Sequence, residues 1–124
     1  MTDLRLLAFR IAAAGAVAAV AIHLTALIIP AFAAAVYPGY PAWRHGVFVA
    51  IDATVAWLFV RRPAWFVWAF AVLTVQVLYS HGGSALASWQ ASGRVAWIDA
   101  LALAAVPLGL VLLVADYRRR SSTL

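Results

Sequence analysis

The chain has 124 residues, of which 67% are hydrophobic and only 10% are charged, and its formal net charge is +5. An average soluble domain has about half its residues apolar and about a quarter charged. Too few charged side chains are present to cover the exterior of a water-soluble fold, whereas lipid tails solvate an apolar exterior directly. The composition therefore excludes an ordinary soluble domain and predicts an integral membrane protein.

The basic residues are distributed as in a membrane protein. All nine are Arg, and they lie at the ends of apolar runs rather than in a stripe with interleaved aromatic residues. This pattern is typical of membrane topology, so no nucleic-acid partner is expected. The absence of Cys excludes disulfides, thiolate metal sites and Cys nucleophiles. Arg without Lys, together with abundant Ala and Val, indicates a bacterial genome of high GC content.

The first apolar segment runs from Leu6 to about Val36. A helix needs only about 20 apolar residues to cross the hydrocarbon core, so this segment is longer than one crossing requires. Pro30 predicts that the helix bends or ends there, which gives a span over about residues 6–30. An Ala-Phe-Ala stretch after the proline resembles a signal-peptide cleavage site. Because the apolar run exceeds the usual core of about 7–15 residues in such peptides, we expect the segment to be retained.

Three further apolar runs are long enough to cross a bilayer. The third of the four spans is expected to end at His81-Gly82-Gly83, where two glycines loosen the chain. These runs predict an all-α protein, a single transmembrane domain over residues 1–124 built as a four-transmembrane-helix bundle. The second, third and fourth spans cover about residues 42–60, 64–80 and 95–115.

The two ends of the spans differ in Arg content. One side of the predicted bundle holds only Arg44 and Arg94. The positive-inside rule therefore predicts a multi-pass protein of the cell (inner) membrane with both termini in the cytoplasm. Trp and Tyr near the span ends are expected to form aromatic belts. The Arg residues of the other side are Arg5, Arg10, Arg61, Arg62, Arg118, Arg119 and Arg120.

Four polar residues lie well inside the spans. His23, Asp52 and Asp99 belong to three different helices, and Gln76 belongs to the remaining one. An ionisable side chain at mid-helix costs roughly 2.5–3.5 kcal/mol on insertion scales, so each needs a reason. At about 1.5 Å per residue, all four are predicted to lie between the midplane and the outer surface, roughly 14–24 Å from the cytoplasmic boundary.

This placement predicts a polar cavity that opens to the outer face. His45 and Asp52 are seven residues apart and share a helix face, with His45 at the outer mouth. His45 and His81 are expected at the rim of the cavity, where an ordinary solvated loop histidine is the simpler interpretation of each. The predicted ligand-binding residues are His23, Asp52, Gln76, Tyr79 and Asp99.

Each buried polar residue also has a structural interpretation. Asp99 could be an interfacial acid favoured by the dipole of the fourth helix. Gln76 could hydrogen-bond between helices as part of their packing. His23 and Asp52 resist such an interpretation best, because neither reaches water easily, although they could form a structural pair.

A His near carboxylates can shuttle protons, act as a general acid or base, or bind a metal. No HxxxH or HExxH spacing is present, so a metal site would depend on folding alone, and no cofactor follows from the sequence. No nucleophile elbow, P-loop or dinucleotide fingerprint occurs. The catalytic candidates are His23, Asp52 and Asp99, and the metal-ligand candidates are His23, His45 and His81.

Three classes of function stay open. The first is a bundle that binds a small ligand, a metal or a partner, such as a hydrophobic small molecule or another subunit of a membrane complex. The second is a membrane-embedded enzyme that performs His/Asp acid–base chemistry on a lipid-like substrate. The third is a small proton-coupled transporter. The sequence favours them in that order.

Overall fold

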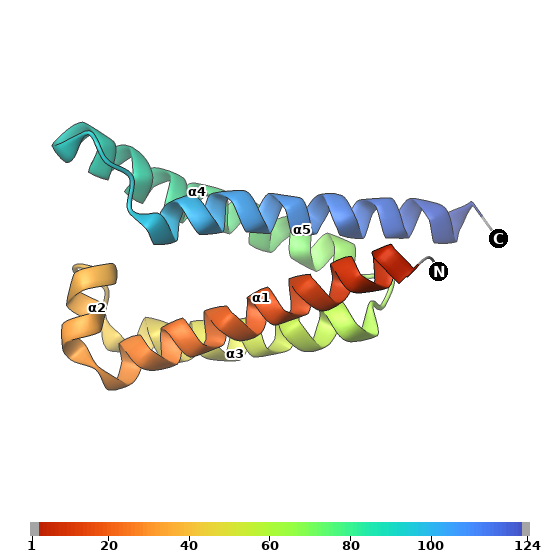
Figure 1. The fold of residues 1–124 in the computed structure, drawn as a ribbon, viewed down its shortest axis with the longest axis horizontal. Helices are drawn as coiled ribbons and strands as arrows, with labels where there is room; N and C mark the ends of the chain where they lie inside the picture. Colours follow the sequence, from red (N-terminus) through yellow and green to blue (C-terminus); the bar gives the residue numbers. More distant parts are fainter. Residues whose placement is uncertain (1–2, 123–124) are drawn as a thin grey trace. The chain divides into compact units, whose positions relative to one another are not determined.

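The computed structural model describes residues 3–122, which form five α-helices (Figure 1). Four of them are long and apolar enough to cross a membrane, namely α1, α3, α4 and α5. The prediction of an all-α protein with four candidate spans is therefore confirmed. The helices are α1 (Asp3–Ile28), α2 (Pro30–Val36), α3 (Ala42–Arg61), α4 (Phe66–Ser92) and α5 (Trp97–Ser121).

The chain divides into two compact units, Met1–Arg62 and Pro63–Leu124. In the first unit, the N-terminal hairpin, α1 and α3 lie side by side and are joined through the short helix α2 (Figure 1). In the second unit, the C-terminal hairpin, α4 and α5 lie side by side.

Proline and aromatic residues define the ends of the N-terminal hairpin. α1 ends at Ile28 and α2 begins with Pro30, as predicted, because proline fits the first turn of a helix and not its interior. At the opposite end, the rings of Phe9 and Phe59 are 6.4 Å apart, and the Arg62 guanidinium lies 4.8 Å from the centre of the Phe9 ring. These contacts join the start of α1 to the end of α3.

α4 is longer than the sequence suggests. It continues through Gly82 and Gly83 to Ser92 and ends at Gly93, whose φ of 67° is left-handed. Glycine inside a helix costs about 0.5–1 kcal/mol relative to alanine, which weakens a helix without ending it. A residue with positive φ at the C-cap does end it, and here the Gly93 N–H donates to the Trp89 carbonyl at 2.8 Å.

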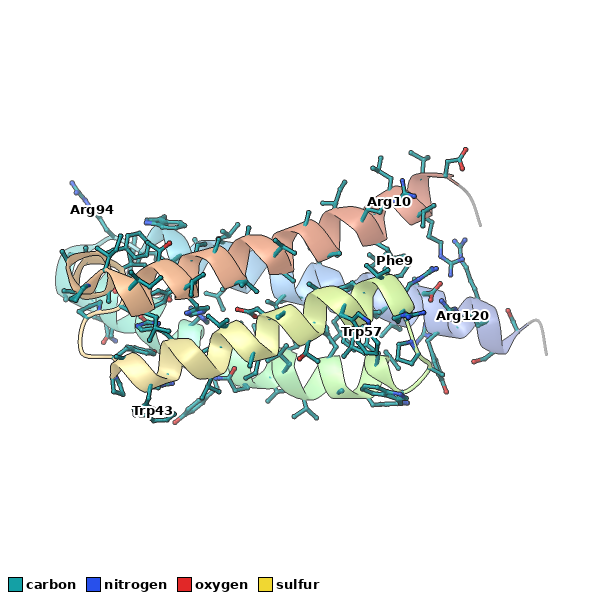
Figure 2. The ribbon with its side chains drawn as sticks, turned by 90° about the horizontal axis from the view of Figure 1, so that it is seen from below. Phe9, Arg10, Trp43, Trp57, Arg94 and Arg120 are labelled. Atoms are coloured by element: carbon teal, nitrogen blue, oxygen red, sulfur yellow. The ribbon has the colours of Figure 1, made fainter. Side chains whose placement is uncertain are left out.

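Exposed Trp residues lie near the ends of two of the candidate spans. In the N-terminal hairpin, Trp43 and Trp57 lie near opposite ends of α3 (Figure 2), and both are more than half exposed. In α4, the exposed Trp68 and Trp89 are 21 residues apart, or roughly 32 Å of helix. That length matches a hydrocarbon core of about 30 Å, so the added turns of α4 fit a membrane-crossing helix.

Alanine substitutions at Gly83 and Gly93 should change the free energy of unfolding in opposite directions. A Cβ added at Gly83 meets no atom within 4 Å, so Gly83→Ala should raise the free energy of unfolding by about 0.5–1 kcal/mol. Gly93→Ala should lower the free energy of unfolding by roughly 1–2 kcal/mol, because a left-handed conformation is unfavourable for alanine. Unfolding of both variants in detergent micelles checks this. A loss of stability in Gly83→Ala would mean that the helix ends near Gly83.

Candidate functional site

Polar residues in and beside the candidate spans form two clusters, one in each hairpin. The N-terminal cluster consists of His23, Tyr37, His45, Phe48 and Asp52. The C-terminal cluster consists of His81, Ser84 and Asp99.

His23 of α1 lies between two polar side chains of α3. Its Nδ1 is 3.2 Å from Nδ1 of His45, which is a hydrogen-bond distance. Its Nε2 is 3.8 Å from Oδ2 of Asp52, which is within ion-pair range but longer than a hydrogen bond. His45 and Asp52 can both reach His23 because they are two turns apart on one face of α3.

Aromatic rings hold the imidazoles of the N-terminal cluster in place. The Tyr37 ring stacks on His23 with centroids 5.3 Å apart and lies 5.0 Å from the His45 ring. Phe48 stacks on His23 at 5.0 Å. Rings packed at these distances restrict side-chain rotation, so the cluster is pre-organised.

His45 is buried, and its position at a solvated rim, expected from the sequence, is wrong. Only 1% of the residue is exposed, because α3 begins at Ala42 and its first turn places His45 in contact with His23 of α1. Among residues 3–122, Nε2 of His45 has no hydrogen-bond partner. Buried polar atoms almost always have a partner in native proteins, so this nitrogen needs an explanation.

The C-terminal cluster is centred on the Asp99 carboxylate. Nδ1 of His81 lies 2.7 Å from Oδ1 of Asp99, and the Ser84 hydroxyl donates to Oδ2 at 2.8 Å. Each oxygen of the carboxyl group thus has a hydrogen-bond partner. Asp99 is 4% exposed and lies in the first turn of α5, where the helix dipole favours negative charge.

His81 also differs from its expected place in a solvated loop. It lies within α4, and its side chain is only 22% exposed. The arrangement is not a Ser–His–Asp triad, because Ser84 donates to the carboxylate and not to the imidazole. Because Nδ1 of His81 faces Asp99, Nε2 is the ring nitrogen through which His81 could act as an acid or a base.

Two other predicted residues lie outside both clusters. Gln76 donates to Ser80 at 3.3 Å, and its Oε1 is buried with no partner within the described part of the chain. Tyr79 is 85% exposed. The cavity shared by His23, Asp52, Gln76 and Asp99 stays a prediction.

The described residues include no set of side chains arranged to bind a metal ion. Within residues 3–122, no group of three or more His, Cys, Asp or Glu side chains is placed to hold a metal ion.

Comparison of the chain with protein-family models, curated proteins and solved structures finds no match. The two clusters are therefore the features on which a function can rest.

Loss of the Asp99 carboxylate should destabilise the C-terminal hairpin. Asp99→Leu removes the acceptor of two hydrogen bonds and is expected to lower the free energy of unfolding by about 1–3 kcal/mol. Ser84→Ala should cost roughly 0.6–1 kcal/mol, within the range of hydrogen bonds between membrane helices. In the double variant the Ser84 effect should vanish, because its acceptor is already gone.

Unfolding of the full chain in detergent micelles measures these effects, with Asp3→Asn as a control at an exposed acid. Additive losses from Ser84→Ala and Asp99→Leu would contradict the shared cluster.

Proposed function

We propose that this chain is a four-helix bundle of the bacterial inner membrane, with both termini in the cytoplasm, that binds a small membrane-soluble ligand at His45. The Arg distribution supports the orientation. α3 ends in Arg61, followed by Arg62, and α5 carries Arg118, Arg119 and Arg120 in its last turn, whereas Arg94 lies in the loop at the other end of the C-terminal hairpin (Figure 2). Arg on one side of the spans is typical of the cytoplasmic face.

The buried Nε2 of His45 is the observation that carries the binding function. A buried polar group without a partner costs about 1–3 kcal/mol, and replacement by an apolar group of similar shape removes that cost. A phenylalanine would fit beside the rings of Tyr37 and His23, which contact His45. Histidine at this position is explained if a bound molecule supplies the missing partner to Nε2.

The surroundings of His45 support a binding role. Its Nδ1 is held by His23, and its ring contacts Tyr37. A ligand that reaches Nε2 therefore meets an imidazole that is already oriented, and binding does not have to order it. The ligand needs a largely apolar body, because both histidines of the cluster lie in α1 and α3, which are candidate membrane spans.

Replacement of His45 separates binding from stability. In His45→Phe the unsatisfied nitrogen is gone, so the free energy of unfolding should fall by no more than about 1 kcal/mol, the lost contribution of the bond to His23. Native mass spectrometry of the full chain released from lipid nanodiscs should show a bound non-lipid mass in the unsubstituted protein and none in His45→Phe.

Trp43→Phe, an exposed position two residues away on the same helix, is the matched control and should keep the mass. If the adducts of the unsubstituted chain and of His45→Phe are the same, or only lipid is found in both, His45 is not a binding residue.

A second candidate function, an acid–base enzyme for a lipid-like substrate, is favoured by the C-terminal cluster. A carboxylate on Nδ1 orients an imidazole and stabilises the imidazolium that forms when Nε2 takes a proton. The 2.7 Å contact between His81 and Asp99 supplies this orientation, and the partial exposure of His81 leaves it within reach of a substrate.

This second role requires an available nitrogen on His81. Diethyl pyrocarbonate, which acylates accessible imidazole nitrogen, should modify His81 roughly ten-fold or more faster than His45, since 22% of one side chain is exposed and 1% of the other residue. Peptide mass spectrometry of the folded chain in nanodiscs measures both rates. Comparable rates at the two histidines would rule out His81 as the selectively available base.

A further inference from the structure

The contacts of His23 restrict where hydrogen can lie on His45. A neutral imidazole has one N–H and one bare nitrogen, and the partner of either nitrogen selects the tautomer. His23 presents Nε2 to the Asp52 carboxyl and Nδ1 to His45. An oxygen of a carboxylate attracts an N–H and repels a nitrogen lone pair, so Asp52 favours hydrogen on Nε2 of His23. Nδ1 of His23 is then bare.

The position of the hydrogen on His23 determines its position on His45. The 3.2 Å contact joins two Nδ1 atoms and needs one donor and one acceptor. Since Nδ1 of His23 is the acceptor, Nδ1 of His45 carries the hydrogen. Nε2 of His45 is therefore a bare lone pair.

The burial of Nε2 is compatible with the tautomer that Asp52 selects. Among residues 3–122, Nε2 of His45 has no partner. Buried N–H groups without a partner are rarer in native proteins than buried acceptors that lack one. Of the two tautomers, the one with a bare Nε2 therefore leaves the more tolerable group unsatisfied.

We propose that the ligand of His45 is a hydrogen donor, a membrane-soluble molecule with a hydroxyl group on an apolar body, and that Asp52 acts through His23 as the positioning residue that selects it. This rests on the binding function proposed above and narrows it. A molecule that offers only carbonyl or ether oxygen meets a lone pair at Nε2 and is rejected. Phenols fit the site best, because their ring can also pack against Tyr37, which lies 5.0 Å from His45.

The tautomers can be read directly, because the chain contains only three His. Solid-state NMR of the full chain with ¹⁵N-labelled His in lipid bilayers distinguishes protonated from bare ring nitrogens. Asp52→Leu and Asp99→Leu form a matched pair, since each removes the carboxyl group of one cluster. We expect hydrogen on Nδ1 of His45 and Nε2 of His23, a mixture of tautomers for both rings in Asp52→Leu, and unchanged His45 signals in Asp99→Leu.

Hydrogen on Nε2 of His45 in the unsubstituted chain, or no change in Asp52→Leu, would overturn the proposal. These NMR results test only the tautomers. Whether His45 binds a ligand at all is tested separately, by the loss of the co-purified mass in His45→Phe.

The chemical class of the ligand is tested with 4-fluorophenol and 4-fluoroanisole. The oxygen attached to the ring carries a hydrogen in the phenol and a methyl group in the ether. The phenol should shift the His45 Nε2 signal at saturable concentration, and the ether should bind roughly ten-fold or more weakly, the equivalent of one lost hydrogen bond. His81→Gln should leave the shift of the His45 Nε2 signal by the phenol unchanged. His45→Phe should abolish binding of the phenol, which ¹⁹F NMR measures. Equal effects of the two probes, or no effect of the phenol on His45, would refute the donor requirement.

Discussion

Lipid tails form no hydrogen bonds, so a polar side chain inside a membrane-spanning helix must find its partner on another part of the protein. Each hairpin of this chain meets that constraint with an imidazole and a carboxyl group from its two long helices. His23 of α1 lies 3.8 Å from Asp52 of α3, and His81 of α4 lies 2.7 Å from Asp99 of α5. These contacts tie the helices of each hairpin together and provide the chemical groups on which a function can be built.

The two clusters suit different chemistry because their polar groups are satisfied to different degrees. In the C-terminal cluster, both oxygens of Asp99 accept hydrogen bonds and the His81 side chain is partly exposed, which suits proton exchange with a molecule that approaches from outside. In the N-terminal cluster, aromatic rings enclose the imidazoles and one nitrogen of His45 lacks a partner within residues 3–122. That arrangement suits a molecule held inside the protein. Hence binding is the first proposal and acid–base catalysis the second.

The parts of the fold that depend on composition and on local chain chemistry could be predicted from the sequence. Apolar runs predicted four candidate spans, and Pro30 predicted the end of α1. The expected proximity of His23 and Asp52 followed from depth along two helices, because charged groups at similar depth in a membrane tend to pair. The seven-residue spacing placed His45 on the same helix face as Asp52, but depth alone could not show that His45 is buried against His23.

The C-terminal cluster could not be predicted for another reason. Gly82 and Gly83 suggested the end of a helix, which placed His81 in a loop. The structure continues α4 through both glycines to Ser92, because a glycine weakens a helix without ending it.

The pairing of an imidazole with a carboxyl group in each hairpin can be measured by solid-state NMR. Distances between ¹⁵N-labelled imidazoles and ¹³C-labelled Asp carboxyls can be assigned on the full chain in a lipid bilayer, because the chain has only three His and four acidic residues. We expect strong dipolar coupling for His23 with Asp52 and for His81 with Asp99. Absence of both couplings would contradict the pairing.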